Sequence, residues 1–260
     1  MSDDPVVAFR RRGMTIGEAY FDPAAADAPG LLRADLVRIV AAPSPVSDRG
    51  WRKRHTLVLD LGDDEDALLA QMHKETRSKI RRAADRDLVE VAGAARPTEA
   101  EVDAFADFYD RFAALQSVAP VFRPRLYALA ARGSLVLTTA ADADGEALVR
   151  HAYVAVGGRG YMLYSGSVLA ESGDSATRNL VGRANRYLHW HDIRLFKERG
   201  FDLYDFGGLD VDERTPKTVG IARFKRGFGG RVVPVYSLTK ARSLRGAAAQ
   251  RILSLRGIEF

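Results

Sequence analysis

The chain has 260 residues, of which 47% are hydrophobic and 28% are charged, and it contains no cysteine. The missing cysteines exclude disulfide bonds, thiolate metal ligands and a cysteine nucleophile, and they fit a reducing compartment. No apolar run approaches the roughly 20 residues of a membrane-spanning helix, and the N-terminus lacks the basic and then apolar order of a signal peptide. We therefore expect a cytoplasmic protein without a membrane span.

The formal net charge is +5, from 39 basic and 34 acidic residues. Such a modest excess mainly solvates a surface, so its distribution says more than its size. The basic residues gather in four stretches, Arg10–Arg12, Arg49–Arg54, Lys74–Arg86 and Arg223–Arg231. If these stretches converge in the fold, they would suit a polyanionic partner.

The first part of the chain alternates strands with a helix. Strands are predicted at Val6–Phe9, Leu36–Val40 and Thr56–Leu61, and again at Leu88–Ala92. One helix is predicted over residues 63–86, because acidic residues gather at its start and basic residues toward its end, as the helix dipole favours. Its basic residues lie mostly off the apolar stripe, where they either solvate the surface or form a phosphate-binding rim.

Two helices and a β-meander are predicted next. A capping box at Thr98 and Glu101 starts the first helix, and the second, shorter helix runs from Pro124 to Arg132. Glycine turns then separate three strands, which defines an antiparallel meander. The three strands are Leu135–Ala140, Ala147–Val156 and Tyr161–Ser165.

A long helix is predicted between Ser175 and Gly200. Its apolar stripe consists of Leu180, Ala184, Leu188, His191 and Leu195. His191 is therefore expected to point into the core. Asn185 and His189 lie four residues apart on a neighbouring face, where they could meet a ligand together.

The remaining elements are a strand at Phe201–Phe206, a polar loop at Asp210–Thr218, a strand at Val232–Leu238 and a basic C-terminal helix. A strand–helix–strand order after an antiparallel meander predicts an α+β (mixed α/β) fold around one central sheet.

Histidine chemistry is the first functional question. His151 lies in the middle strand of the meander, where it could act as a general base, donate a hydrogen bond to substrate, or be a satisfied structural residue. The five histidines form neither a His-Glu-x-x-His motif nor a carboxylate cluster at ligand spacing. We therefore expect no metal site and no bound cofactor.

Two stretches resemble known families. Asn179-x-x-Gly182-x-Ala184 differs at one position from the Gln/Arg-x-x-Gly-x-Gly/Ala loop of acyl-CoA N-acetyltransferases of the GNAT superfamily. Tyr-Asp-Phe-Gly-Gly at 204–208, followed by Gly220-Ile221-x-x-Phe224-Lys225-x-x-Phe228-Gly229-Gly230, resembles the Fem (FemABX) family. The basic helix from Lys74 to Ala83 looks like that family's basic helix. The resemblance covers about residues 55–240 and is strongest over 179–230.

The Fem resemblance implies a fold and an activity. Fem proteins are built from GNAT-like domains and attach amino acids from aminoacyl-tRNA to peptidoglycan precursors or related amines. The implied fold is a GNAT-like, mixed but largely antiparallel central sheet flanked by helices. We expect one such domain over residues 1–240, with an N-terminal strand extension, and a basic helix over 241–260 packed on it. Members that modify lipid intermediates carry two such domains, so small peptides or amino sugars fit this length better as acceptors.

The resemblance also implies roles for residues in amide formation, in which an amine attacks an activated carbonyl. Lys225 would lie near the donor's carbonyl and phosphates, or else be a surface lysine. Asp205, flanked by aromatic residues, would be a partly buried base or a structural carboxylate holding the Gly207–Gly208 turn. His151 completes the catalytic candidates.

The binding candidates form two groups. The residues expected to bind the donor are Asn179, Gly182, Arg183, Arg223, Arg226 and Gly229. The residues expected to bind the acceptor are Asn185, His189, Tyr164, Arg77 and Arg81. Aminoacyl-tRNA is the expected donor and therefore the expected partner, with a coenzyme A thioester as the alternative. A non-catalytic RNA- or nucleotide-binding module is the alternative from a different class.

Overall fold

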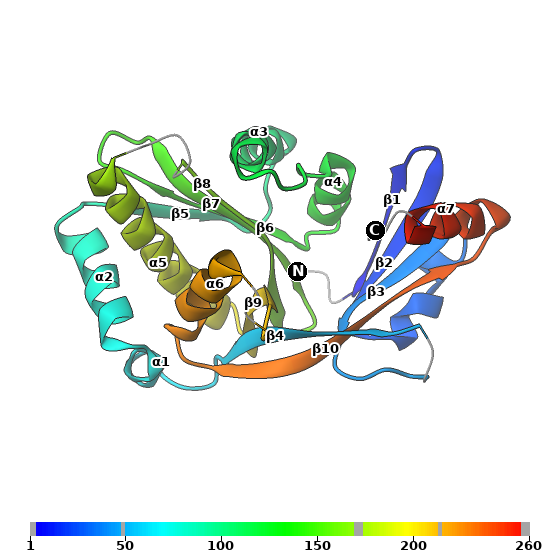
Figure 1. Ribbon diagram of the computed structural model, residues 1–260, viewed down its shortest axis with the longest axis horizontal. Coiled ribbons are helices and arrows are strands. Elements are labelled where there is room, and N and C mark those ends of the chain that lie inside the picture. Colours follow the sequence, from blue (N-terminus) through cyan, green and yellow to red (C-terminus); the bar gives the residue numbers. More distant parts are fainter. Residues whose placement is uncertain (1–3, 48–49, 169–173, 213–214, 256–260) are drawn as a thin grey trace.

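A computed structural model describes residues 4–47, 50–168, 174–212 and 215–255. Ten strands within these ranges form one sheet in the order β1-β2-β3-β10-β4-β9-β8-β7-β6-β5 (Figure 1). The strands are β1 (Val6–Arg11), β2 (Met14–Tyr20), β3 (Leu36–Ala42), β4 (Arg52–Asp60), β5 (Glu90–Ala94), β6 (Leu135–Ala141), β7 (Ala147–Val156), β8 (Arg159–Ser167), β9 (Leu203–Leu209) and β10 (Arg231–Ala241).

Strand direction agrees with the predicted sheet. The β2–β3 and β8–β9 pairs are parallel, and the other neighbouring strands run antiparallel. The predicted α+β fold with a mixed, largely antiparallel sheet is therefore confirmed. In Figure 1 the long strands β4 and β10 bridge two groups, β5–β9 on the left and β1–β3 on the right.

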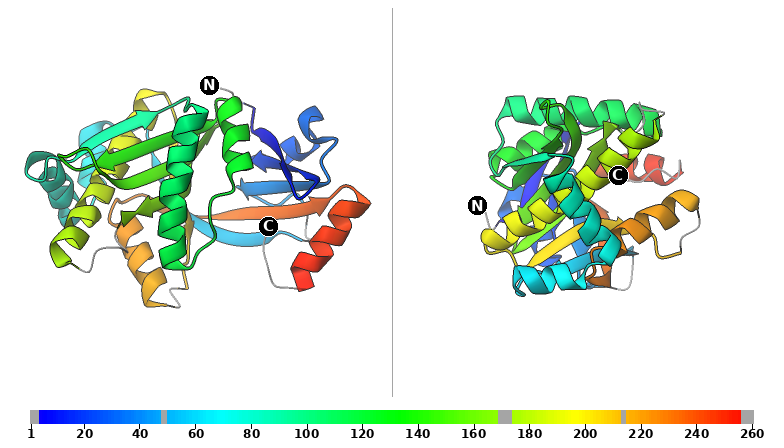
Figure 2. Two further views of the ribbon diagram at one scale, coloured as in Figure 1. Left: turned by 90° about the horizontal axis from the view of Figure 1, so that it is seen from above. Right: turned by 90° about the vertical axis from the view of Figure 1, so that its left-hand side faces the viewer.

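Helices cover both faces of the sheet. The helices are α1 (Glu65–Gln71), α2 (Lys74–Asp85), α3 (Glu99–Gln116), α4 (Arg123–Ala131), α5 (Ser175–Glu198), α6 (Pro216–Arg226) and α7 (Leu244–Leu255), with two short 3-10 helices at Ala24–Asp27 and Pro29–Leu31. Helix α5 packs on β6 and β7 and carries α2 on its outside, whereas α3 and α4 pack on β1 and β6–β8 (Figures 1 and 2). Figure 2 shows α7 beside β10, at the far end from α5.

Alternating residues of the strands divide the core into two faces. On β7, Tyr153 and Ala155 pack in the core beneath α5. The alternate residues Ala152 and Val154 face the other side of the sheet and pack in the core with residues of α3 and α4. Each face of the sheet therefore has a core of its own.

The predicted single helix over 63–86 is wrong. It is broken at Met72 and His73, whose backbones are extended. Met72 is buried, and the backbone N–H of His73 donates to the carbonyl of Gly227 at 2.9 Å. Tertiary packing against the segment after α6 therefore overrides the helical pattern.

The predicted polar loop over 210–218 is also wrong at its end, because α6 begins at Pro216. Thr215 caps this helix through the backbone N–H of Thr218 at 3.2 Å, and proline occupies the first position. A threonine cap followed by proline is a helix-start signal that the sequence carried. The basic, glycine-rich segment is consequently helical up to Arg226.

The expected orientation of two histidines is reversed. His189 is 2% exposed, whereas the side chain of His191 is 24% exposed. The buried stripe of α5 consists of Val181, Ala184, Leu188, His189, Trp190, Asp192, Ile193 and Phe196. The buried face of α5 is thus shifted by about one residue from the predicted apolar stripe. The reason is that α5 covers a cluster of polar side chains as well as apolar ones.

Among the residues that the structure describes, no helix combines the length and apolar character needed to cross a lipid bilayer.

Candidate active site

The parallel strands β8 and β9 pair only over a short distance. Their paired residues run from Arg159 opposite Leu203 to Tyr161 opposite Asp205. Beyond Asp205, the carbonyl groups on the edge of β9 that faces β8 need other hydrogen-bond donors. Lys225, near the end of α6, supplies one: its Nζ donates to the carbonyl oxygens of Phe206 at 2.8 Å and Gly208 at 2.7 Å. Lys225 therefore marks the point at which the two strands separate.

Lys225 is half-buried, and burial makes its charged form less favourable than it is in water. Burial lowers the pKa of Lys225 to about 8, although the nearby negative charge of Asp205 opposes this shift. The side chain can therefore exchange a proton near neutral pH, and while charged it places a cation beside β9.

Asp205 is fully buried, and its carboxylate is saturated with hydrogen bonds. Oδ1 accepts from the backbone N–H of Gly207 at 2.8 Å and from the hydroxyl of Thr56. Oδ2 accepts from Nε of Arg159 at 2.8 Å and from a second nitrogen of the same guanidinium. Four donors fill the roughly four acceptor sites of a carboxylate. This geometry favours the structural alternative for Asp205, because a general base needs a free lone pair.

His151 belongs to a buried polar network beneath α5. Its Nδ1 lies 2.8 Å from Oδ2 of Asp192, and its Nε2 lies 3.1 Å from Oδ1 of Asn185. The hydroxyl of Tyr153 donates to the same carboxylate oxygen at 2.6 Å and lies 2.7 Å from the hydroxyl of Tyr204. Both ring nitrogens of the fully buried His151 thus lie beside polar side chains.

The network continues to His189, whose Nδ1 lies 2.7 Å from the hydroxyl of Tyr204. Because Tyr153 donates to a carboxylate, it accepts from Tyr204, which in turn accepts from Nδ1–H of His189. Burial and the neighbouring His151 hold the pKa of His189 well below its usual value. A neutral His189 therefore packs against Phe224, with ring centroids 5.4 Å apart.

Asp192 anchors this network as a carboxylate. Burial raises its pKa, but hydrogen bonds from His151, His191 and Tyr153 lower the pKa overall. One ligand-type atom from each of His151, His189 and Asp192 lies within 4.8 Å of the others, a grouping that sequence spacing did not show. Within this group, His151 bonds to Asp192, whereas Nδ1 of His189 bonds to the hydroxyl of Tyr204.

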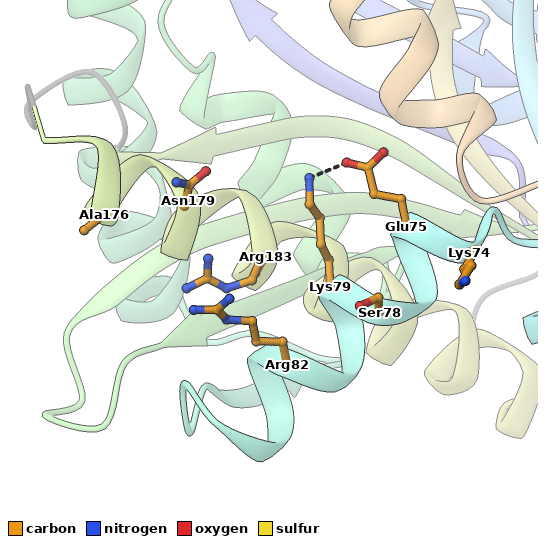
Figure 3. A pocket seen from close by; sticks show the side chains of 8 residues that line it. All are labelled: Lys74, Glu75, Ser78, Lys79, Arg82, Ala176, Asn179 and Arg183. Carbon is orange, nitrogen blue, oxygen red and sulfur yellow. Dashed lines mark hydrogen bonds and ion pairs between the residues drawn. The ribbon is translucent and has the colours of Figure 1, made fainter.

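A basic groove lies between α2 and the first half of α5 (Figure 3). Its volume is about 810 Å³, and its lining residues are Lys74, Glu75, Ser78, Lys79, Arg82, Ala176, Asn179 and Arg183. Lys79 pairs with Glu75 at 2.6 Å, and Arg183 pairs with Asp87. The four basic side chains outnumber the single acidic one that lines the groove. The surface is therefore suited to phosphate groups.

The side chain of Asp174 occupies part of the N-terminus of α5. The side chain of Asp174 accepts from the backbone N–H groups of Ala176 at 3.0 Å and Thr177 at 3.2 Å. Gly182 lies inside the helix, where its N–H belongs to the helical hydrogen-bond ladder rather than to the free first turn. The Asn179–Ala184 stretch is therefore not an anion-binding loop.

Similarity to known proteins lies in the fold rather than in the sequence. No protein-family model matches the chain, and no curated protein matches it. Among solved structures, FemX is similar with a TM-score of 0.60 and 14% identity, over 95% of this chain and 86% of FemX. The chain has the FemX fold. It is the fold that the resemblance at residues 204–208 and 220–230 implied, so this expectation about the fold is confirmed.

Two further structures share the fold. The C-terminal domain of a putative lysylphosphatidylglycerol synthetase from Agrobacterium fabrum gives a TM-score of 0.54 at 15% identity, over 98% of this chain and 87% of that domain. L-PGS from Bacillus licheniformis gives 0.53 at 13% identity, over 99% and 87%. Identities this low establish the fold alone.

Within the FemX fold, the predicted site residues fall into separate groups. Lys225 and Asp205 meet at β9, and His151, Asn185 and His189 meet in the network. Asn179 and Arg183 line the groove.

The remaining residues predicted to bind the acceptor are Tyr164, Arg77 and Arg81, and none of the three has a hydrogen bond to the polar network beneath α5 among the described residues. Tyr164 packs against Tyr109 of α3 with ring centroids 4.9 Å apart, on the sheet face opposite the polar network. Arg77 donates to the carbonyls of Leu69 and Met72, so it holds the end of α1 rather than projecting freely. Arg81 is exposed on α2 and does not line the groove.

Two arginines and one glycine complete the predicted donor-binding set. Arg223 and Arg226 are exposed on α6. Gly229 has a φ of +81°, and an added Cβ would lie 2.8 Å from the carbonyl oxygen of Gln71. Glycine is thus required there by chain packing, whether or not a ligand approaches.

Several members of these groups were not predicted from the sequence. Tyr204 stands inside the quoted 204–208 motif, and Asp192 follows directly after the two histidines of α5. Lys79 and Arg82 belong to the basic helix, but only the packing of α2 on α5 distinguishes them from Arg81. Arg159 carried no local signal, because its partner Asp205 is 46 residues away.

Proposed function

We propose that the protein is an N-acyltransferase that forms an amide bond between an activated acyl donor and an amine, with aminoacyl-tRNA as the donor. The observation that carries this proposal is Lys225, whose ammonium group lies where β8 and β9 separate in a FemX fold. The Fem-like motifs at 204–208 and 220–230 surround this same point.

The chemistry requires an amine to attack the donor's ester carbonyl. A C–N bond forms, the C–O bond to the tRNA breaks, and the amine's proton is transferred to the departing ribose oxygen, which becomes a hydroxyl. Negative charge develops on the carbonyl oxygen before the bond breaks. The cation of Lys225 offsets that charge, while Asp205, held by Arg159, keeps the Gly207 turn and the end of β9 in place.

The groove favours tRNA over coenzyme A as the donor. Its basic side chains come from two helices, with Lys74, Lys79 and Arg82 on α2 and Arg183 on α5. Such a spread suits a run of phosphates rather than one pyrophosphate. The coenzyme A alternative was based on the Asn179–Ala184 stretch, which is regular helix. Asp174 also occupies two backbone donors that such a pyrophosphate would use.

The acceptor is proposed to be an amine on a small peptide, an amino sugar or a cell-wall precursor, modified in the cytoplasm. This range follows from the Fem resemblance. The similar domain from Agrobacterium fabrum is named as part of a putative lysylphosphatidylglycerol synthetase, and the product in that name carries a lysyl group on a phospholipid. Residues of β8 and β9 around the separation point would border the acceptor.

Donor profiling tests this proposal. Purified protein is incubated with a labelled aminoacyl-tRNA mixture or with an acyl-CoA panel, each with candidate amines, and products are identified by mass. We expect transfer from charged tRNA, with loss of transfer in a folded Lys225→Ala variant. Transfer from acyl-CoA alone would make coenzyme A the donor. RNA binding with no transfer from either donor would leave the binding module as the function.

A further inference from the structure

A second charged cluster lies on the sheet face opposite α5. Tyr204 and Phe206 pack beneath α5, so Asp205 between them points to the other face, where it meets Arg159. On the same face, β2, β3 and α4 bring together three further charged residues. These are Glu18, Arg38 and Arg125.

Two arginines share one buried carboxylate in this cluster. Glu18 is fully buried, and its two oxygens accept from Nη1 of Arg38 and from Nε of Arg125, both at 2.7 Å. The hydroxyl of Tyr20 also donates to Glu18 at 2.5 Å. Burial raises the pKa of Glu18, but Arg125 and Arg38 lower it overall, so the carboxylate is charged. One negative charge therefore faces two positive ones.

An excess of positive charge in a partly desolvated place is unfavourable unless an anion completes it. Asp205 does not compensate for it, since Arg159 already pairs with that carboxylate.

Arg38 is the member best placed to receive an anion. Its side chain is 26% exposed, against 14% for Arg125. Within the described part of the chain, its side chain donates a single N–H bond, to Glu18. A guanidinium has five N–H donors, so four remain on a group whose position Glu18 fixes. Such a pre-oriented fork matches the two oxygens of a carboxylate or phosphate.

Tyr161 connects this cluster to the proposed reaction point. Its ring packs against Phe21 with centroids 5.7 Å apart, and the guanidinium of Arg159 lies 4.6 Å from the centroid of the same Phe21 ring. Phe21 in turn packs against Tyr20, whose hydroxyl donates to Glu18. Tyr161 is also the last residue of β8 that pairs with β9. The cluster therefore borders the strand separation from one face, while Lys225 borders it from the other.

We propose that Arg38 and Arg125 bind an anionic group, a carboxylate or a phosphate, on the acceptor molecule. The anion site is argued from the contacts of Arg38 and Arg125 alone, and only its assignment to the acceptor rests on the proposed function. Donor and acceptor then approach from opposite faces of the sheet, and the acceptor's amine reaches the carbonyl between β8 and β9.

The test is titration calorimetry of the intact protein with inorganic phosphate and with succinate, at low ionic strength. We expect saturable binding of at least one anion, and the one that saturates identifies the acceptor's group. Arg38→Gln should weaken that binding by roughly 10- to 100-fold, since hydrogen bonds to charged groups are lost. Arg38→Lys should be intermediate, because it keeps the charge without the fork.

Arg33→Gln is the matched control, because Arg33 is exposed just before β3. Glu18 keeps Arg125 and Tyr20 in the Arg38 variants, so thermal unfolding should show folded proteins. No saturable binding of either anion, wild-type affinity in Arg38→Gln, or equal weakening in Arg33→Gln would each overturn the proposal.

The transfer assay separates this inference from the proposed function. With an anionic acceptor, Arg38→Gln should raise the acceptor's KM at least tenfold and leave the donor's KM unchanged. Anion binding that depends on Arg38, without transfer from any donor, would refute the transferase and retain the anion site. An unchanged acceptor KM in an active Arg38→Gln enzyme would refute the acceptor assignment.

Discussion

The ammonium nitrogen of Lys225 lies 2.8 Å from the carbonyl oxygen of Phe206, so a side chain from α6 replaces the partner that β9 lacks beyond Asp205. The same lysine also contacts the carbonyls of Gly207 and Gly208. A substrate carbonyl that enters beside β9 would thus meet a cation whose position is already fixed. Such preorganisation is what electrostatic stabilisation of an oxyanion requires.

The first prediction concerns the pH dependence of transfer. Since burial lowers the pKa of Lys225 to about 8, kcat/KM should fall as pH rises through about 8 and the cation is lost. Lys225→Arg should be slower but keep its rate above pH 8, because a guanidinium stays charged. Lys225→Met should lose roughly 100- to 1,000-fold in kcat. Identical profiles for wild type and Lys225→Arg would exclude this role.

The second prediction separates the two roles proposed for Asp205. Asp205→Asn leaves the buried Arg159 without its counter-charge, which should cost about 3–5 kcal/mol in the free energy of unfolding. Urea titration measures this cost. Glu198→Gln removes an exposed carboxylate and should change stability by less than about 0.5 kcal/mol. A fully stable Asp205→Asn variant without turnover would instead identify Asp205 as the catalytic base.

The third prediction concerns His189. Its folded-state pKa lies below the unfolded value of about 6.5, so below pH 6.5 the unfolded chain binds the additional proton. Stability should therefore fall from pH 6.5 to 5 by up to about 1.4 kcal/mol per pH unit. His189→Gln keeps an N–H donor for Tyr204 and should remove this slope. His73→Gln, at an exposed position, should keep it. An unchanged slope in His189→Gln would contradict the assignment.

The fourth prediction concerns the basic groove. The double variant Lys79→Ala/Arg82→Ala should weaken tRNA binding and reduce the slope of log affinity against log salt by about 0.7–0.9 for each phosphate that the variant no longer neutralises. Filter binding over a salt series measures both effects. Lys240→Ala, on the exposed end of β10, should behave like the wild type. Equal weakening in both variants would indicate nonspecific attraction.

Much of the fold follows from local sequence signals, and much of the site does not. The meander and the Thr98 capping box were predictable because their determinants lie within a few residues. The break at Met72 and the burial of His189 depend on distant partners, Gly227 and Tyr204. Periodicity marks which face of a helix is buried, but not that a polar cluster lies there.

The candidate site shows the same division. Lys225 was found because a contiguous motif carries it. Arg38 and Glu18, which carry the inference about the acceptor, were not found, because they meet Arg125 only through the packing of α4 on the N-terminal strands. Long-range ion pairs leave no trace in a single sequence.

The last prediction compares two glycines around α6. Gly229→Ala should destabilise the protein by about 2–4 kcal/mol, since its φ of +81° disfavours a side chain and the new Cβ would lie 2.8 Å from the carbonyl oxygen of Gln71. Gly220 lies on the exposed side of α6 with nothing within 4 Å of an added Cβ. Gly220→Ala should stabilise by about 0.5–1 kcal/mol through helix propensity. Urea unfolding of both variants measures the contrast. Equal effects would show that the turn after α6 is not tightly held against α1, and the position assigned to Lys225 depends on that packing.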